Sequence, residues 1–373
     1  MPSPNQPHPP DYQGGSLVNL MAELEWRLTG KAPSPRLHMA LAAAVPEART
    51  YIVLLMDGLG THQLSHPDSS SLRDAYRHTL DAPFPTTTTV SLSTVATGLA
   101  PLEHGLLGHH IWLPERSIVA NSLKWIARGG SPIDIDTTTY LPGPNLWERL
   151  AATGVEPITV QPGRFANTPL SRALYRGCRF EPVWDNEELA RAIVELACTG
   201  PRLIFGYLPE IDFAAHLFGQ TSSEYAGALR SVAVTWDAIV NHLPPQVTLI
   251  GTADHGHIDY LHADKFLIDP KMVKGLTLFG DPRALYAKGG RRSIERCREA
   301  MPATWFDQPD ILNWWGPEAL VRPEFAERMP DGVFLADQGR LLIPGHMDKR
   351  LIGYHGGLDP RELKIPLLVA EHR

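Results

Sequence analysis

The chain has few cysteines and no apolar run long enough to cross a membrane. Its 373 residues include three cysteines, Cys178, Cys198 and Cys297, and no two of them form a CxxC pair. Neither a disulfide framework nor a thiolate zinc site is therefore expected, which fits a reducing compartment. A transmembrane helix needs roughly 18 or more consecutive apolar residues, and no segment reaches that length.

The chain also lacks an excess of basic residues. It has 34 Lys and Arg residues against 41 Asp and Glu residues, for a net charge of −7. The composition therefore does not indicate a basic surface that would bind a nucleic-acid polymer. An anionic substrate would need a local source of positive charge. Residues 1–10 have neither the basic start nor the apolar core of a secretory signal. We therefore expect a cytoplasmic protein without a membrane partner, and the sequence does not indicate an oligomeric state.

The length and the 43% hydrophobic content allow a large core, organised as one large domain with an insertion or as two domains. Residues 1–15, rich in Pro and Gly, predict a loose arm, and Ser16 caps a helix, so we assign residues 1–40 to an N-terminal arm and helix. Residues 41–373 would form the main domain. Poor periodicity and many Arg, Pro and Trp residues predict an inserted cap at about 260–345.

Three apolar runs, at 51–56, 203–208 and 247–250, lack alternation, which is typical of strands buried on both faces. Potential metal ligands follow these runs: Asp57 after the first, Asp212 and His216 after the second, and Asp254 and His255 after the third. In open α/β sheets, ligands bind beyond the carboxyl ends of the strands. The pattern predicts an α/β fold with a mostly parallel central sheet and helices on both faces.

A run of four threonines, Thr86 to Thr89, precedes apolar residues at helical spacing. A hydroxyl at a helix N-terminus lies among free N–H groups and the positive end of the helix dipole, which favours a bound anion. Taken alone, such threonines are more often N-cap and loop residues. His355, flanked by glycines, is a further candidate ligand.

Each motif has a simpler explanation when taken alone, such as a surface polar pair for Asp212 and His216. Their recurrence at corresponding ends of apolar runs favours a two-metal site, and mixed Asp and His donors suit zinc, with manganese as an alternative. Other histidines are expected to form hydrogen bonds or line a rim: His104, His109, His110, His257 and His346. Three aromatic residues could stack on a base or aryl group, although core packing is the default: Trp112, Phe218 and Tyr225.

In their order along the chain, these motifs resemble the alkaline phosphatase superfamily, and most of all its nucleotide pyrophosphatase/phosphodiesterase branch. The resemblance covers residues from about 50 to 370. It rests on the following segments: Leu-Met-Asp57-Gly, Phe84-Pro-Thr-Thr-Thr88, Ala-Thr97-Gly-Leu, Glu103-His-Gly, Asp212-x-x-x-His216, Ala-Asp254-His255-Gly and His355-Gly.

The resemblance implies a hydrolase that cleaves phosphodiester or pyrophosphate bonds in small nucleotide-type substrates with two divalent metal ions, most often Zn²⁺. It also implies two ligand sets: Asp212, His216 and His355 for one ion, and Asp57, Asp254, His255 and the nucleophile for the other. The nucleophile falls on Thr88, with Thr87 as its nearest rival, and would form a covalent phospho-threonine that water then hydrolyses.

The chain departs from this branch beside the nucleophile. Where the branch usually has a lysine before the nucleophile and an asparagine three residues after it, the chain has Thr87 and Ser91. We expect Thr87, Ser91 or backbone N–H groups to contact the phosphate. The arginine and third-metal set of phosphomonoesterases has no clear counterpart, which favours diesters or phosphonates. The absence of a Cys-x-Pro-x-Arg motif disfavours a sulfatase. A phosphonate or phosphomonoester hydrolase and a non-catalytic metal-bound module remain alternatives.

Overall fold

The structure is a computed structural model that describes residues 7–317, 322–345 and 347–372. Its centre is a seven-stranded sheet in the order β2-β18-β9-β1-β8-β6-β7. The strands are β1 (Thr50–Met56), β2 (Tyr76–Asp81), β6 (Glu156–Pro162), β7 (Arg179–Val183), β8 (Arg202–Leu208), β9 (Val247–Thr252) and β18 (Lys364–Glu371). Strand β18 is antiparallel to both of its neighbours, β2 and β9, and the other neighbouring strands of this sheet are parallel to each other. The predicted α/β class with a mostly parallel sheet is confirmed.

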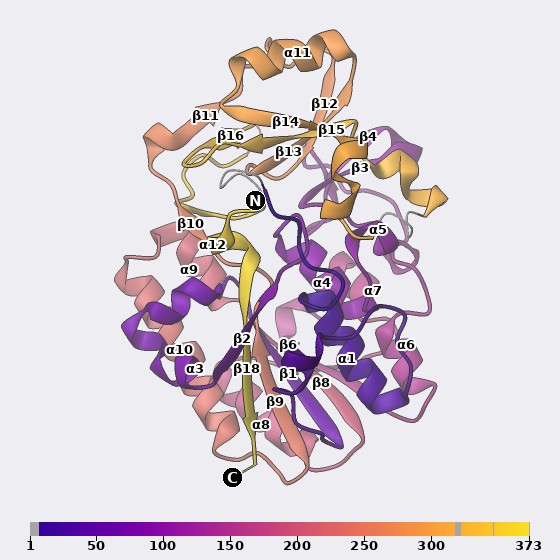
Figure 1. The fold of residues 1–373 in the computed structure, drawn as a ribbon, viewed down its shortest axis with the longest axis vertical. Coiled ribbons are helices and arrows are strands. Elements are labelled where there is room, and N and C mark those ends of the chain that lie inside the picture. Colours follow the sequence, from indigo (N-terminus) through magenta and orange to yellow (C-terminus); the bar gives the residue numbers. More distant parts are fainter. Residues whose placement is uncertain (1–6, 318–321, 346, 373) are drawn as a thin grey trace.

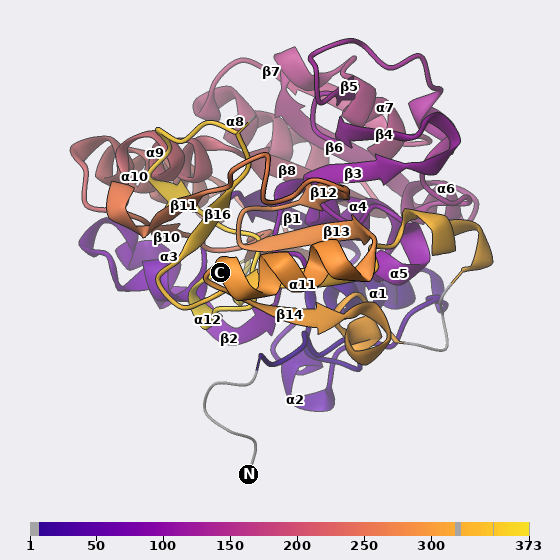
Figure 2. The ribbon, with the colours of Figure 1, turned by 90° about the horizontal axis from the view of Figure 1, so that it is seen from above.

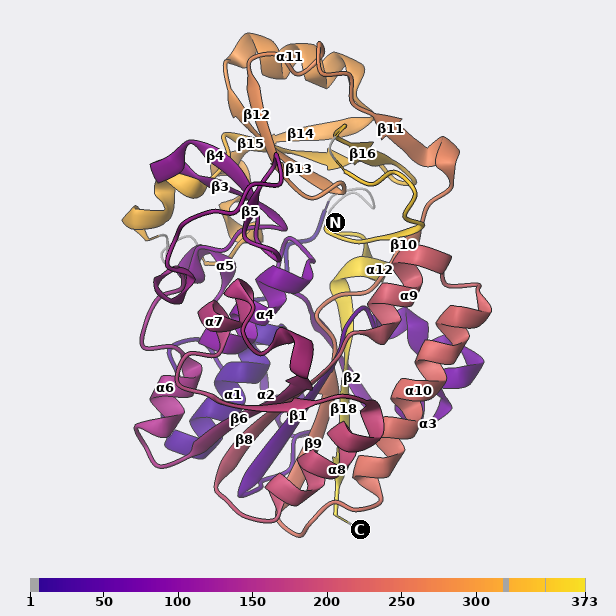
Figure 3. The same cartoon turned by 180° about the vertical axis from the view of Figure 1, so that it is seen from behind.

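Helices cover both faces of the central sheet (Figures 1 and 3). One face carries α1 (Leu17–Thr29), α4 (Thr88–Thr97), α6 (Leu146–Ala151) and α7 (Pro169–Leu174). The other carries α3 (Ser70–Asp74), α8 (Asn186–Ala197), α9 (Glu210–Phe218) and α10 (Ser223–Val240). Every residue of β1 and β9 is buried between these layers, which explains their continuous apolar sequences. Short helices are α2 (Met39–Ala42), α5 (Pro101–His104) and α12 (Pro360–Leu363).

A second sheet lies beyond the carboxyl ends of the parallel strands (Figure 1). Its order is β14-β15-β13-β12-β3-β4-β5, and all its pairs are antiparallel. The strands are β3 (His110–Leu113), β4 (Ile118–Asn121), β5 (Ile126–Ala127), β12 (Leu276–Gly280), β13 (Ala284–Gly289), β14 (Ala303–Asp307) and β15 (Gly332–Ala336). Helix α11 (Arg291–Ala300) lies across β13 and β14 (Figure 2). Two small ladders complete the fold: β10 (Ile258–Asp259) with β17 (Gly353–Tyr354), and β11 (Lys265–Leu267) with β16 (Leu341–Ile343).

The segment predicted to form an inserted cap is only part of this second sheet. Its strand β12 pairs with β3 through Gly280 and His110, so β3, β4 and β5 extend the same sheet. These three strands come from the stretch before residue 130, outside the predicted insertion at about 260–345. The physical reason is shared burial: Val119 and Leu107 pack in one apolar cluster with Tyr286 of β13.

The N-terminal residues differ from the prediction of a loose arm. Tyr12 is buried, its hydroxyl donates to the carbonyl of Trp314 at 2.8 Å, and the same oxygen accepts the N–H of Phe84 at 3.0 Å. Tyr12 is therefore held between Phe84 and Trp314, while residues 1–6 lie outside the described residues. In the described part of the chain, no helix has the length and apolar character that a membrane span requires.

Candidate active site

The predicted metal ligands meet at one edge of the central sheet. Strands β9, β1 and β8 are neighbours in the middle of that sheet. Asp57 follows β1, Asp254 and His255 follow β9, and α9, which carries Asp212 and His216, follows β8. Parallel strands that end together therefore bring these residues to one place, as expected at the carboxyl ends of an open α/β sheet. The loop after β17 adds the last predicted ligand.

Asp212, His216 and His355 form what we call the first cluster. Asp212 Oδ1 lies 3.3 Å from His216 Nε2 and 3.7 Å from His355 Nε2, and the two Nε2 atoms are 3.3 Å apart. Ligand atoms at about 2.0–2.1 Å from a tetrahedral zinc ion are separated by roughly 3.3 Å. The spacing of these three atoms therefore fits three corners of a zinc tetrahedron.

Asp57, Asp254, His255 and Thr88 form the second cluster. His255 Nε2 lies 3.2 Å from Thr88 Oγ1, 3.3 Å from Asp254 Oδ2 and 3.6 Å from Asp57 Oδ1. Among the described residues, Asp57 Oδ1 and Asp254 Oδ2 are buried without a hydrogen-bond partner. A buried carboxylate oxygen without a partner loses the stabilisation that water gives it. A cation bound between the two oxygens would restore that stabilisation. The two clusters adjoin, because the rings of His255 and His355 stack at 3.6 Å.

Backbone carbonyls orient the three predicted histidine ligands. The Nδ1 atoms of His216, His255 and His355 lie 2.7, 3.1 and 2.8 Å from carbonyl oxygens of Gly353, Gly256 and Thr86, respectively. A carbonyl oxygen only accepts, so each Nδ1 carries the proton and each Nε2 keeps its lone pair toward the clusters. Metal-binding histidines are commonly held this way.

The charges of the site also fit a bound cation. Burial, followed by the charges of Asp212 and Asp254, raises the pKa of Asp57 well above its usual range. Burial alone would raise the pKa of Asp212 too, but His216, His257 and His355 hold it well below its usual range. Burial and the neighbouring imidazoles lower the pKa of His355. Clustered carboxylates with neutral imidazoles are the donor set that a divalent ion stabilises, since it offsets the repulsion between the acids.

Of the four consecutive threonines, Thr88 is the one whose hydroxyl reaches a cluster. It is the first residue of α4 and is half-buried, whereas Thr86, Thr87 and Thr89 are fully buried. The hydroxyl of Thr86 donates to the carbonyl of Gly357, and Thr87 is the helix N-cap. The geometry therefore separates Thr88 from its neighbours, which the sequence alone did not.

Ser91 and Thr87, the side chains that we expected to contact the phosphate, are both buried. Ser91 is buried one turn into α4, and its hydroxyl donates to the carbonyl of Asp254 at 2.8 Å. That bond holds α4 against the loop that follows β9. Thr87 is 1% exposed, so its hydroxyl has little access to a ligand. Backbone N–H groups at the start of α4 remain the better placed donors.

His257, which we expected to be a hydrogen-bonding or rim residue, lies directly against the first cluster. Its Nε2 is 2.7 Å from Asp212 Oδ1, and Asp212, His255, His257 and His355 each offer a ligand atom within 4.8 Å of the others. A distance of 2.7 Å is a hydrogen-bond length and is shorter than the roughly 3.3 Å between two zinc ligands. No local pattern in the sequence indicated this contact, because Asp212 lies 45 residues before His257.

Other residues named from the sequence lie outside the clusters. His104 is buried behind α4 beside Thr94, and His110 begins β3. The ring of His109 contacts the side-chain amide of Asn121 at 2.8 Å. His346 lies outside the described residues. Three aromatic residues differ in exposure: Trp112 is half-buried in β3, Phe218 is exposed at the end of α9, and Tyr225 is buried in α10.

Tyr207 was not predicted at all. It stands one residue before the end of β8, and its hydroxyl donates to Asp57 Oδ2. Within an apolar strand, a tyrosine reads as core packing, so the sequence offered no signal for this role. Burial and the neighbouring carboxylates raise the pKa of Tyr207, which keeps the phenol neutral and able to donate.

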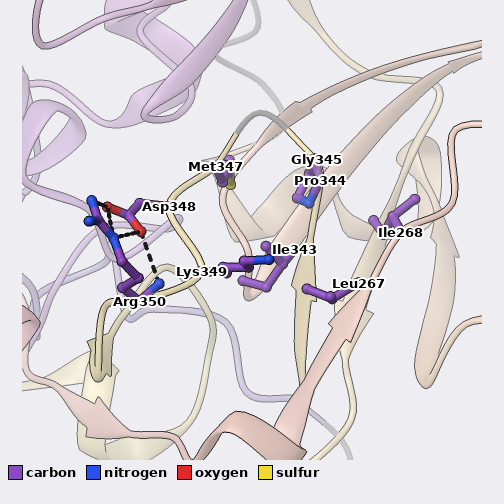
Figure 4. Close-up of a pocket in the computed structure, with 9 residues that line it drawn as sticks. All are labelled: Leu267, Ile268, Ile343, Pro344, Gly345, Met347, Asp348, Lys349 and Arg350. Carbon is purple, nitrogen blue, oxygen red and sulfur yellow. Dashed lines mark hydrogen bonds and ion pairs between the residues drawn. The ribbon is translucent and has the colours of Figure 1, made fainter.

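A separate pocket lies at the ladder of β11 and β16 (Figure 4). It has a volume of about 320 Å³. Its lining residues are Leu267, Ile268, Ile343, Pro344, Gly345, Met347, Asp348, Lys349 and Arg350. Arg350 pairs with Asp348 at 2.7 Å, as Figure 4 shows, and no lining residue belongs to either cluster. We therefore assign the chemistry to the clusters and not to this pocket.

Comparisons with known proteins agree with this geometry. The sequence model of the type I phosphodiesterase / nucleotide pyrophosphatase family matches residues 51–272. The murine ectonucleotide pyrophosphatase / phosphodiesterase 5 is similar in structure, with a TM-score of 0.67, 17% identity, and coverage of 86% of this chain and 88% of that one. Phosphonoacetate hydrolase from Sinorhizobium meliloti, in complex with phosphonoacetate, has a TM-score of 0.63, 16% identity, and coverage of 88% and 92%.

A search among curated protein sequences gave no match. The family match extends over more than half of the chain and contains all of the ligand candidates except His355. The structural neighbours extend the same fold over most of the remainder. This chain belongs to the type I phosphodiesterase / nucleotide pyrophosphatase family and is a phosphoric ester hydrolase.

Proposed function

We propose that this enzyme uses two metal ions to cleave phosphodiester or pyrophosphate bonds in small nucleotide-type substrates, with Thr88 as the nucleophile. One observation carries the proposal: six side chains from distant parts of the chain converge in two adjoining clusters, and the Thr88 hydroxyl lies 3.2 Å from His255 Nε2 in one of them. The family is metal-dependent, and the donors suit zinc, with manganese as the alternative.

In this proposal, Thr88 Oγ1 attacks the phosphorus atom, loses its proton, and forms a phospho-threonine as the leaving group departs. Water then hydrolyses that ester and restores the hydroxyl. A threonine hydroxyl is a poor nucleophile at neutral pH, and divalent cations held by the clusters would supply the positive charge that activates it and stabilises charge on the phosphoryl group. The free N–H groups at the start of α4 add a second favourable field for the anion.

The structural neighbours support this substrate class. A threonine-to-alanine variant of the murine phosphodiesterase 5, described in complex with AMP, is inactive. The Sinorhizobium meliloti enzyme is described with phosphonoacetate and with phosphonoformate. A phosphonate or phosphomonoester hydrolase is therefore the second candidate, because one of the similar folds belongs to a phosphonate hydrolase.

The first test compares Thr88→Ala, Thr88→Ser and Thr87→Ala in the zinc-loaded enzyme, with an aryl phosphodiester, an aryl phosphomonoester and phosphonoacetate as substrates. We expect Thr88→Ala to lower kcat by on the order of 10³-fold or more, while Thr88→Ser keeps a nucleophilic hydroxyl and part of the activity. Thr87→Ala is the matched control, because Thr87 is 1% exposed and the contact with His255 is made by the Thr88 hydroxyl.

Mass spectrometry of the acid-quenched enzyme should locate phosphate on Thr88 in the wild type. Full activity of Thr88→Ala would refute the proposed nucleophile, and loss of activity in Thr87→Ala alone would move it to Thr87. Faster turnover of phosphonoacetate than of the diester would favour the second candidate. Zinc binding without turnover of any of these substrates would favour a non-catalytic module.

A further inference from the structure

We propose that Thr86 and the buried ion pair of Arg283 with Glu362 are positioning residues for His355, so that the second sheet sets the metal affinity of the first cluster. We call residues 353–357 the His355 loop. The inference rests on the proposed function, because it concerns the same metal site. It assigns a role to residues that neither hold a ligand atom nor touch the substrate.

Thr86 binds three consecutive residues of the His355 loop. Its backbone carbonyl accepts the Nδ1–H of His355 at 2.8 Å. Its hydroxyl accepts the N–H of Gly356 at 3.0 Å and donates to the carbonyl of Gly357, also at 3.0 Å. Thr86 is fully buried and stands two residues before Thr88. The orientation of one predicted ligand of the first cluster therefore depends on one buried threonine.

Glu362 of α12 fastens the same loop to the second sheet. Its Oε2 accepts the N–H of Gly357, and its Oε1 accepts the Nε–H of Arg283 at 2.7 Å. Arg283 also donates to the carbonyl of Arg340 at 2.7 Å. The side chains of Arg283 and Glu362 are 4% and 0% exposed, so the pair is removed from solvent. A buried pair of this kind specifies one geometry, because removing either partner leaves the other charge uncompensated.

The turn between β12 and β13, which contains Arg283, also packs directly on the His355 loop. A Cβ atom added to Gly356 would lie 2.6 Å from the Cβ of Asp281, and Gly356 has a φ of +118°. A Cβ atom on Gly357 would lie 3.3 Å from the Cβ of Arg283. The two glycines therefore permit this close approach, and the turn cannot move without moving the loop. On its other side, Asp281 Oδ2 accepts the N–H of His109 at 3.3 Å.

This arrangement connects the second sheet to the first cluster. It does not connect that sheet to the second cluster by the same route. Residues that orient a metal-binding histidine typically change metal affinity by about 10- to 100-fold when they are mutated. The Nδ1 atom of His255 in the second cluster is held by its own neighbour Gly256, not by Thr86. A substitution that removes the Thr86 hydroxyl should therefore weaken one metal site and leave the other near its normal affinity.

The test measures zinc stoichiometry and affinity by titration of the chelator-stripped full-length protein, with Co²⁺ absorption as a second readout. Thr86→Val keeps the shape and the carbonyl but removes the hydroxyl. We expect one of two zinc sites to weaken by about 10- to 100-fold, with a changed Co²⁺ spectrum for that site. Thr86→Ser restores the hydroxyl and should restore the affinity.

Thr97→Val is the matched control. Like Thr86, Thr97 is fully buried, but its hydroxyl donates to the carbonyl of Ser93 at 2.6 Å and accepts the N–H of Leu99 at 3.3 Å, and neither residue belongs to the His355 loop. This variant should bind both zinc ions as the wild type does. If Thr86→Val does not fold, Glu362→Gln gives the answer, because it keeps the side-chain shape while removing the charge opposite Arg283. We expect Glu362→Gln to weaken the same single site.

Wild-type affinity at both sites in a folded Thr86→Val, or in Glu362→Gln where Thr86→Val fails to fold, would overturn the inference. Equal weakening of both sites would overturn it too, because the proposed link reaches the first cluster alone. Failure of the wild type to bind zinc or manganese would instead refute the proposed function. The two failures are therefore distinguishable in the same titration.

Discussion

Two carboxylates of the site take their orientation from uncharged side chains. The Tyr207 hydroxyl donates to Asp57 Oδ2, and the His257 ring binds Asp212 Oδ1 at 2.7 Å. Space for the His257 ring depends on glycine, because a Cβ atom on Gly58 or Gly353 would approach it to 2.9 Å. A carboxylate oxygen has enough lone pairs to accept this bond and to face a cation. We therefore place His257 behind the first cluster, as an orienting partner of Asp212.

Replacement of His257 by Phe keeps a ring in this space and removes the donor. We expect zinc affinity at one site to fall by about 10- to 100-fold because Asp212 is then free to rotate. Competition with a zinc chelator measures the change, and the other site of the same variant is the internal control. Loss of one zinc ion at all concentrations would instead indicate that His257 is itself a ligand.

His104 gives the folded protein a stability that depends on pH. Burial lowers its pKa from 6.5 to about 3, and its Nδ1 accepts the N–H of Leu106 at 3.2 Å. Below pH 6.5 the unfolded chain binds a proton that the folded chain does not, so stability is lost as the pH falls from 6.5 toward 3. This imidazole should therefore make the folded protein about 2 kcal/mol less stable at pH 5 than at pH 8.

Urea unfolding of the chelator-treated wild type and His104→Gln at both pH values measures this cost. Glutamine can still accept a hydrogen bond but does not titrate, so its loss of stability between pH 8 and pH 5 should be smaller by about 2 kcal/mol. Equal losses in the two proteins would show that His104 is not the titrating group.

At the scale of elements, one buried ion pair joins three helices on the same face of the central sheet. Glu25 of α1 accepts two hydrogen bonds from Arg149 of α6, at 2.6 and 2.8 Å. Arg149 also donates to the carbonyl of Thr97, the last residue of α4, at 2.9 Å. Because α4 begins at Thr88, this contact fixes the far end of the helix that carries the proposed nucleophile.

Glu25→Gln should destabilise the fold by about 2 kcal/mol, because it leaves the charge of the largely buried Arg149 uncompensated. Glu47→Gln is the control: Glu47 is 79% exposed where it pairs with Arg27, so its loss should change stability by roughly 0.5 kcal/mol or less. The free energy of unfolding from urea titration measures both. An equal, small effect would mean that the Glu25 pair does not hold the helices together.

At the scale of the whole molecule, the second sheet is not a separable cap. Its apolar cluster combines Tyr286 and Trp315 from the inserted segment with Phe84, Leu107 and Val119 from residues before the insertion. A fragment of residues 260–345 lacks β3 and these three side chains. Without them, the inner face of β12 and β13 would be exposed to water, at a cost of roughly 25 cal/mol per Å² of apolar surface.

We therefore expect the fragment 260–345 to be unfolded when it is expressed alone. Its ¹H–¹⁵N amide spectrum should be narrow, and its amides should exchange with solvent without protection. A dispersed spectrum with slowly exchanging amides would show that the inserted segment is a domain in its own right.

The sequence shows some of these features and hides others. Strands β1, β8 and β9 were predictable because burial on both faces demands continuous apolar sequence, and the residues that follow them identified five candidate ligands. The edge strands β2 and β7 were missed, since exposed and buried residues mix along them without a clear pattern. Residues 7–15 were misjudged, because the contacts that hold Tyr12 come from Phe84 and Trp314.

The sequence by itself determined the fold class and the kinds of ligand, because buried strands and metal donors each demand particular residue types. Only the tertiary structure separated Thr88 from its rival Thr87, placed His257 against Asp212, and joined β12 to β3. Each of these depends on a side chain or strand edge that meets another segment of the chain. Along the sequence, the two segments are more than a hundred residues apart in two of the three cases and 45 residues apart in the third. Contacts between segments so far apart in the sequence are set by packing and leave no local pattern in the sequence.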